Sequence, residues 1–116
     1  MKTLIIDDEV DICYLLSSIL RNKGISAQYV NSLAEANKCL QNEKPDIIFL
    51  DNHLPDGMGM DYISYIKEYR PTAKIIMISA YDTSTDRSKA IQLGADQFIA
   101  KPFTIENIYN AVERLA

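Results

Sequence analysis

Acidic residues stand at two places in the sequence where carboxylate chemistry would be useful. Asp7 and Asp8 are adjacent and follow an aliphatic run, and Asp51 follows a second aliphatic run. Three carboxylates brought together would repel one another, so the pKa of at least one of them would rise. A divalent cation removes this repulsion, and oxygen ligands from few side chains suit Mg²⁺, which keeps several waters and binds phosphate oxygens. The pattern therefore predicts a magnesium site, provided that the fold brings the two places together.

A hydroxyl group and an ammonium group follow two further aliphatic runs, at Ser79 and Lys101. Lys101 adds a positive charge for which the metal leaves no carboxylate free. A metal ion and an ammonium group on either side of one carboxylate would stabilise an incoming phosphoryl group, and an Asp nucleophile can form an acyl phosphate. Ser79 could donate to a phosphoryl oxygen. Each residue alone has a structural explanation, since an Asp after a strand often caps the next helix, and only the combination indicates phosphoryl chemistry.

The elements that must position these residues are five short apolar runs that alternate with amphipathic stretches. The expected strands cover residues 4–6, 27–30, 46–50, 74–78 and 97–99, and the expected helices cover residues 10–23, 32–42, 60–69, 83–93 and 104–115. This alternation predicts a doubly wound α/β fold, in which helices cover both faces of a parallel five-stranded sheet. Ligands bind beyond the carboxyl ends of strands in such sheets, and every residue singled out above follows a strand.

Local signals indicate where several helices begin and end. Ser32 and Glu35 have the spacing of a capping box, and Thr83 and Thr104 can cap the fourth and fifth helices. Gly94 suits the left-handed conformation that often follows the last turn of a helix.

Length and composition restrict the function further. The chain has 116 residues, which suits one domain covering residues 1–116. It carries 12 Lys and Arg against 16 Asp and Glu, a formal net charge of −4, so we expect no direct binding of nucleic acid by this segment. No apolar run approaches the ~20 residues of a membrane span, and no signal-peptide pattern is present. Cys13 and Cys39 form no CxxC pair, so we expect reduced thiols in a cytoplasmic protein.

The order of the motifs resembles a known family, the receiver domain of two-component response regulators, of the chemotaxis-receiver type. The resemblance covers essentially the whole chain and rests on Ile5-Ile6-Asp7-Asp8-Glu9, Asp51 with Pro55 and Gly59, Ser79-Ala80, Leu93-Gly94-Ala95-Asp96 and Lys101-Pro102-Phe103. It implies the flavodoxin-like strand order 2-1-3-4-5.

The resemblance also implies roles for the acidic residues. Asp51 corresponds to the phosphoacceptor. Asp8, Asp51 and the backbone carbonyl of His53 would bind Mg²⁺, with Asp7 acting mainly through water. The side chains of His53 and Tyr81 would flank the path of the water that hydrolyses the acyl phosphate, and so set its lifetime.

Further residues would contact the phosphoryl group or transmit its presence. Lys101, the Ser79 hydroxyl and the Ala80 backbone correspond to phosphoryl contacts, and the bond before Pro102 would be cis. Ser79 and Phe98 correspond to the switch pair, which would change the face formed by the fourth helix, the fifth strand and the fifth helix. Phe98 lacks the hydroxyl of the tyrosine often found at its position, so a plain core role stays open.

The implied function is a signalling switch with no separate substrate to turn over. The donor would be a sensor histidine kinase or a histidine phosphotransfer protein, and the recipient an effector protein or an output domain. A phosphatase of the haloacid-dehalogenase type would need a second Asp two residues after the first, where Glu9 stands. A flavin-binding protein would need a Ser/Thr/Gly-rich loop in place of the acidic one. An interaction module that is never phosphorylated remains a third alternative.

Overall fold

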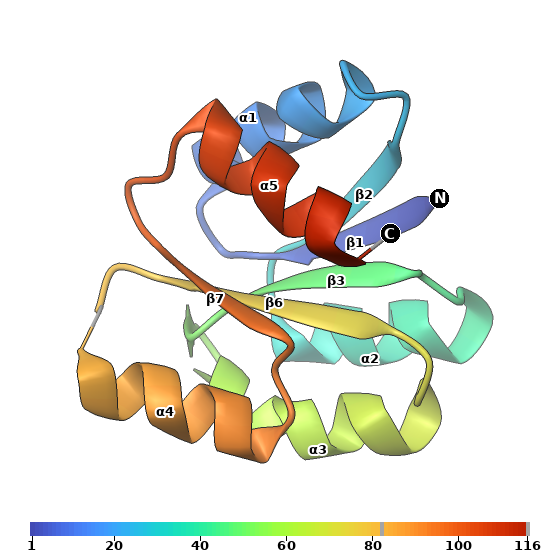
Figure 1. Cartoon of the computed structure of the whole chain (residues 1–116). Coiled ribbons are helices and arrows are strands. Elements are labelled where there is room, and N and C mark those ends of the chain that lie inside the picture. The colour runs from blue at the N-terminus through green and yellow to red at the C-terminus, as the bar shows by residue number, and fades with distance from the viewer. Residues whose placement is uncertain (82, 116) are drawn as a thin grey trace.

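Five strands form one parallel sheet in the computed structural model, which describes residues 1–81 and 83–115. They are β1 (Lys2–Ile6), β2 (Ser26–Val30), β3 (Ile47–Asp51), β6 (Lys74–Ser79) and β7 (Gln97–Ala100). Their spatial order is β2-β1-β3-β6-β7, and each neighbouring pair is parallel (Figure 1). Counted along the chain this is the order 2-1-3-4-5, so the predicted flavodoxin-like α/β fold is confirmed.

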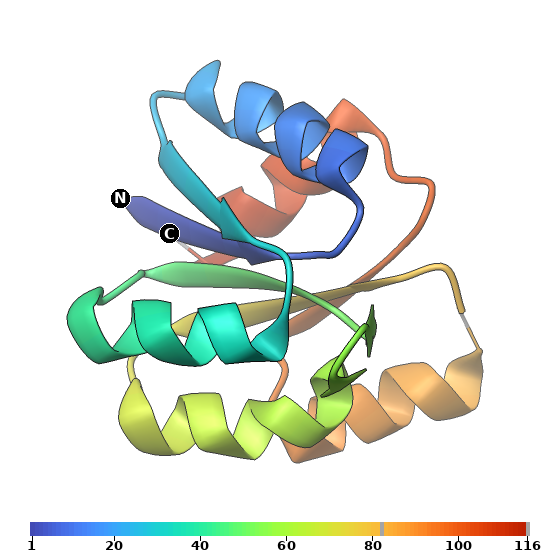
Figure 2. The ribbon, with the colours of Figure 1, turned by 180° about the vertical axis from the view of Figure 1, so that it is seen from behind.

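Five helices cover the two faces of the sheet. One face carries α1 (Val10–Arg21) and α5 (Ile105–Leu115), and the other carries α2 (Leu33–Asn42), α3 (Gly59–Tyr69) and α4 (Ser84–Leu93) (Figures 1 and 2). Side chains alternate between two cores, because successive strand residues point to opposite faces. In β1, Leu4 and Ile6 join the α2, α3 and α4 side, and Ile5 joins the α1 and α5 side. Strand β3 is buried along its whole length, as its unbroken apolar run predicts.

Most of the predicted helix caps are present. The capping hydroxyls of Ser32, Thr83 and Thr104 each accept an N–H from the first turn that follows, and Gly94 is left-handed with φ 119°. The reciprocal bond of the capping box differs from expectation, because the Glu35 carboxylate accepts the N–H of Asn31 rather than that of Ser32.

Helix α2 is additionally tied at both ends by side chains from other elements. The Asp56 carboxylate accepts hydrogen bonds from the first two N–H groups of the helix, both at 2.9 Å, and these bonds lower the pKa of Asp56. At the other end, the Arg70 guanidinium donates to the carbonyl oxygens of Leu40 and Glu43. An acid at the amino end and a base at the carboxyl end both complement the helix dipole.

The structure also differs from the sequence-based expectation after β3. A short antiparallel hairpin is present, made of β4 (His53–Leu54) and β5 (Gly57–Met58), between the strand expected to end at residue 50 and the helix expected to begin at residue 60. Two-residue strands are too short to show the alternation of apolar and polar residues that marks a strand in a sequence. Strands β3 and β6 also each run one residue further than expected, so Asp51 and Ser79 end their strands rather than follow them.

The helices are 10 to 12 residues long. A helix needs about 20 apolar residues to cross a bilayer. Within the ranges that the structure describes, none of the helices combines the length and the apolar character of a membrane span.

Candidate functional site

The three aspartates singled out in the sequence lie together at one edge of the sheet. Strands β1 and β3 are parallel neighbours with Ile6 opposite Leu50, so Asp7 and Asp51 leave the sheet side by side. One carboxylate oxygen from each of Asp7, Asp8 and Asp51 lies within 4.8 Å of the others. Asp7 and Asp51 are buried and Asp8 is exposed, so the cluster is open to water on one side only.

Lys101 lies against these carboxylates. Its ammonium nitrogen is 2.9 Å from Asp7 Oδ2, 3.2 Å from Asp51 Oδ1 and 3.2 Å from Glu9 Oε1. The lysine side chain is only 9% exposed. The expectation that no carboxylate is left for Lys101 is therefore wrong for this structure, because three carboxylates contact its ammonium group. Glu9 is the carboxylate that this expectation left out.

Burial and crowding shift the acidity of the site. Burial raises the pKa of Asp51 to about 6, and the negative charge of Asp7 contributes to the rise. The pKa of Asp7 is also raised by burial, although its hydrogen bond to Lys101 acts in the opposite direction. Burial alone would lower the pKa of Lys101, but Asp7 and Asp51 raise it overall. The repulsion predicted for three neighbouring carboxylates is thus present.

The donor set fits a divalent metal ion. All the candidate ligand atoms are carboxylate oxygens, which are the ligands that hard cations such as Mg²⁺ and Ca²⁺ prefer. The three aspartates carry up to three negative charges, and Lys101 compensates only one of them. A divalent cation would offset the rest and favour the ionised form of Asp51.

Ser79 ends β6 at the same edge of the sheet. Its side chain is buried, and its Oγ accepts the backbone N–H of Tyr81 at 3.1 Å. The backbone N–H of Lys101 donates to the Ser79 carbonyl at 2.8 Å, which keeps the two loops together. The exposed ring of Tyr81 lies 4.4 Å, centroid to centroid, from the ring of His53, and Ala80 between Ser79 and Tyr81 is exposed.

Phe98 does not belong to this cluster. It lies within β7 opposite Met77, and its ring packs against the core on the α2, α3 and α4 side. The guanidinium carbon of Arg87 lies 4.9 Å from the ring centroid. The ring is half-buried, as either a switch aromatic or a plain core residue would be. The peptide bond between Lys101 and Pro102 is cis.

The loops after Asp7 and Asp51 are fixed by residues that were not predicted as site residues. Asn52 is buried, and its side-chain and backbone oxygens accept the N–H groups of Met60 and Gly59 at 3.0 and 2.8 Å. A Cβ atom at Gly59 would lie 2.2 Å from the Asp51 carbonyl oxygen, so only glycine fits there. Asn31 donates to the Asp7 carbonyl at 2.9 Å. Gly59 is part of the motif on which the family resemblance rests, but these asparagines show no sequence pattern.

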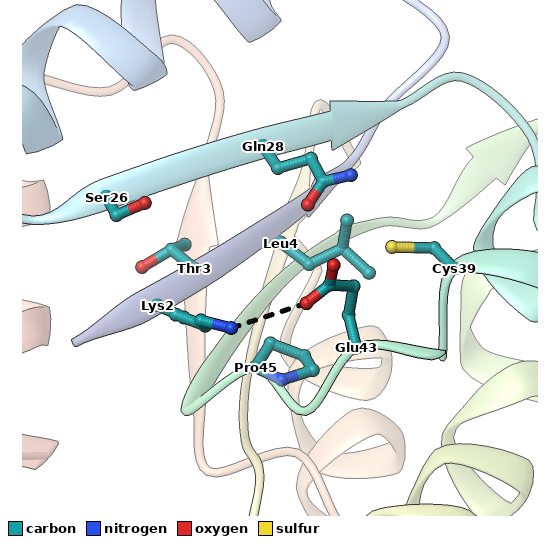
Figure 3. Close-up of a pocket in the computed structure, with 8 residues that line it drawn as sticks. All are labelled: Lys2, Thr3, Leu4, Ser26, Gln28, Cys39, Glu43 and Pro45. Atoms are coloured by element: carbon teal, nitrogen blue, oxygen red, sulfur yellow. Dashed lines mark hydrogen bonds and ion pairs between the residues drawn. The ribbon is translucent and has the colours of Figure 1, made fainter. Parts of the chain in front are cut away.

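A small pocket elsewhere is separate from this site. It has a volume of about 160 Å³ and lies beside the amino-terminal half of β1 (Figure 3). Asp7 follows the opposite, carboxyl end of that strand. Leu4, Cys39 and Pro45 form part of its lining, and the Lys2–Glu43 ion pair at 3.4 Å lies at its border. Ligand pockets usually measure about 300–1,000 Å³, so we assign it no ligand.

Comparison with known proteins agrees with this geometry. A model of the family described as the response regulator receiver domain matches residues 3–113. The chain is 34% identical over 118 residues to the chemotaxis protein CheY of Listeria monocytogenes, covering 100% of this chain and 98% of that protein. Other curated relatives are longer, and the chain spans between 25% and 52% of the length of five of them.

Solved structures agree as well. The beryllofluoride-activated NtrC4 receiver domain has a TM-score of 0.93 at 33% identity, covering 98% of this chain and 94% of that one. A response regulator from Burkholderia pseudomallei was solved with a phosphorylated aspartic acid and a calcium ion. It has a TM-score of 0.87 at 29% identity, covering 97% of this chain and 69% of that one. The chain therefore belongs to the response regulator receiver domain family, and it is a phosphoacceptor signalling switch rather than an enzyme that turns over a separate substrate.

Proposed function

We propose that residues 1–116 form one receiver domain that accepts a phosphoryl group on Asp51 in a Mg²⁺-dependent reaction. The surroundings of the Asp51 carboxylate carry this proposal. It lies 3.2 Å from the Lys101 ammonium group, and ligand atoms of Asp7 and Asp8 lie within 4.8 Å. A carboxylate between a cation site and an ammonium group can attack phosphorus while the charge of the transferred group is compensated.

Receiver domains partner with histidine kinases and output domains. For this chain, the proposed donor is a phosphohistidine on a sensor histidine kinase or a histidine phosphotransfer protein. Asp51 attacks phosphorus, the phosphorus–nitrogen bond breaks, and the imidazole leaves with the electron pair. The product is an acyl phosphate on Asp51. A cytoplasmic location, where Cys13 and Cys39 would stay reduced, suits this role.

The proposed cation is Mg²⁺, held directly by Asp8, Asp51 and the backbone carbonyl of His53, with Asp7 acting mainly through water. When bound, it would neutralise charge on the phosphoryl oxygens. Two observations support this assignment. The donors are all oxygen atoms, and the exposure of Asp8 leaves room for the waters that Mg²⁺ retains.

Three groups from other strand ends are proposed to hold the phosphoryl oxygens. They are the Lys101 ammonium group, the Ser79 hydroxyl and the backbone N–H of Ala80. The hydrogen bond between the Lys101 N–H and the Ser79 carbonyl supports this grouping, because it keeps both loops at the same edge. Preorganised donors of this kind stabilise phosphoryl transfer without further rearrangement.

The proposed output is a change on the face formed by α4, β7 and α5. Ser79, drawn toward the phosphoryl group, would pull the loop that leads to α4, and Phe98 in β7 would respond to the space released. This face already contains a groove of about 310 Å³ lined by Phe98, Arg87 and Arg114 among others. A downstream effector protein or an output domain is the proposed recipient. The formal net charge of −4 argues against direct nucleic-acid contact by this segment.

The rings of His53 and Tyr81 are proposed to set the lifetime of the acyl phosphate. Their ring centroids lie 4.4 Å apart, so two bulky side chains, each two residues beyond the end of β3 or β6, contact each other. We predict that Tyr81 blocks the attacking water, so Tyr81→Ala should lose the phosphoryl group faster. The rate of dephosphorylation after removal of the donor tests this, and an unchanged or slower rate contradicts it.

The decisive experiment is phosphorylation by acetyl phosphate with Mg²⁺, followed by intact-mass measurement. Wild type should gain one phosphoryl group, and Asp51→Asn should gain none. Asp61→Asn, at an exposed acid in the first turn of α3, is the matched control and should label like wild type. Full labelling of Asp51→Asn would refute the assignment of the acceptor. No labelling of wild type would favour the remaining alternative, an interaction module that is never phosphorylated.

A further inference from the structure

The third carboxylate that contacts the Lys101 ammonium group takes no part in the proposed phosphoryl transfer. Glu9 Oε1 lies 3.2 Å from the Lys101 ammonium nitrogen, although the two residues are 92 positions apart in the chain. The Lys101 side chain is 9% exposed and the Glu9 side chain is 60% exposed. Glu9 therefore contacts the ammonium group from the solvent side, whereas Asp7 and Asp51 contact it from the interior.

The local structure directs Glu9 to this contact. Glu9 is the N-cap residue of α1, a position that favours short polar side chains able to accept a first-turn N–H. Its side chain makes no such capping bond. Its backbone N–H donates to Asp7 Oδ1 at 2.9 Å, which fixes the main chain beside the site. The carboxylate is thus free of the helix and lies on Lys101.

The other two contacts of Lys101 would weaken when the site is loaded. Asp7 and Asp51 belong to the proposed metal site, and Asp51 would itself carry the phosphoryl group. Their attraction for the ammonium group would then be shared with a divalent cation. Glu9 is not among the proposed metal ligands, so its contact with Lys101 can persist throughout the reaction.

We infer that Glu9 is a positioning residue, whose carboxylate holds the Lys101 ammonium group at the mouth of the site, ready to meet the phosphoryl oxygens. This inference rests on the proposed role of Lys101 as a phosphoryl contact. A positioning role for Glu9 predicts a change in anion affinity opposite in sign to the change expected from charge alone. Removal of a negative charge near an anion site should tighten anion binding, whereas loss of a positioning contact should weaken it.

The test uses beryllofluoride, a phosphoryl mimic, with the whole chain at a Mg²⁺ concentration that saturates each variant. Glu9→Gln keeps the size of the side chain and the backbone of the N-cap. Asp11→Asn removes the same charge from the exposed first turn of α1 and is the matched control. Glu9→Gln should bind beryllofluoride about threefold to tenfold more weakly, as expected for loss of one partly exposed charge-assisted hydrogen bond. Asp11→Asn should bind as wild type does or slightly more tightly.

A second measurement observes the lysine directly. The ¹⁵N resonance of the Lys101 ammonium group, identified by its loss in Lys101→Met, should be sharp in metal-free wild type because the ion-paired group exchanges protons slowly. It should shift or broaden in Glu9→Gln and stay unchanged in Asp11→Asn. Unchanged beryllofluoride affinity or an unchanged lysine signal in Glu9→Gln would overturn the inference alone. Failure of wild type to bind beryllofluoride with Mg²⁺ would overturn the proposed function, and the inference with it.

Discussion

Helices α2 and α4 lie on the same face of the sheet, on either side of α3, and each has ten residues, yet they are held in different ways (Figure 1). Helix α2 buries Ala36 and Leu40 completely, and Asp56 and Arg70 tie its two ends to other elements. Helix α4 has Ala90 as its buried residue.

The caps of α4 come from its own flanking residues. Thr83 accepts a first-turn N–H, and the N–H of Gly94 bonds back to the last turn. A helix with little buried apolar surface costs less free energy to displace than one that is buried and tied. The difference indicates that α4, on the face proposed to carry the signal, is displaced at a lower cost in free energy than α2.

The largest expected effect comes from truncating one large apolar side chain on each helix. Leu40 in α2 is fully buried and Ile91 in α4 is 48% exposed. Leu40→Ala should lower the free energy of unfolding by about 2–5 kcal/mol, because it leaves a cavity. Ile91→Ala should change it by about 0.5 kcal/mol or less. Urea unfolding measures both, and equal losses would remove the basis of the comparison.

The site at the carboxyl ends of β1 and β3 should show the next largest effect, through Asp51. Its pKa is raised from 3.8 to about 6 by burial and by Asp7. An acid whose pKa is higher in the folded state contributes stability that is present below its unfolded pKa and is lost as the pH rises through its folded pKa. Metal-free Asp51→Asn escapes this loss. Its free energy of unfolding should equal that of wild type near pH 4 and exceed it by about 1–3 kcal/mol at pH 7.

Urea unfolding in the presence of a chelator, at several pH values between those limits, measures the difference. The gain should grow with pH, and Asp61→Asn should show no such trend. A difference between wild type and Asp51→Asn that does not depend on pH would contradict the electrostatic explanation.

The convergence of Asp7, Asp8, Asp51, Ser79 and Lys101 could be predicted from the residues, because strand ends in a parallel sheet share one edge whatever the loops do. The strand order followed only from the resemblance to the receiver domain family. The contacts that hold α2 in place could not be predicted from the sequence. Asp56 and Arg70 contact α2 from positions that carry no helix-cap pattern. The contact of Glu9 with Lys101 joins the two ends of the chain. Such bonds depend on three-dimensional proximity, which hydrophobic periodicity does not encode.

The caps of the two helices provide a smaller and more local test. Loss of a cap costs about 1 kcal/mol, so Asp56→Ala and Thr83→Ala should each weaken one helix start. In α2 the loss should appear mainly as lower global stability, because the helix is buried and opens only with the core. In α4 it should appear as faster amide hydrogen exchange confined to residues 84–93. Exchange measured by NMR separates the two, and faster local exchange in α2 but not in α4 would reverse the comparison.

The smallest expected signal, and the most informative one, is the response of the two helices to beryllofluoride. The proposed route runs from Asp51 through the Ser79 hydroxyl to Phe98 and α4, while α2 stays tied by Asp56. Amide chemical shifts should therefore change along α4, β7 and α5 in wild type, and little along α2. Ser79→Ala should greatly reduce the changes on the α4 side, whereas Ser79→Thr, which keeps a hydroxyl, should preserve them. A response of α4 that survives Ser79→Ala would show that the signal leaves Asp51 by another path. A response of α2 as large as that of α4 would show that its bonds to Asp56 and Arg70 do not hold it in place.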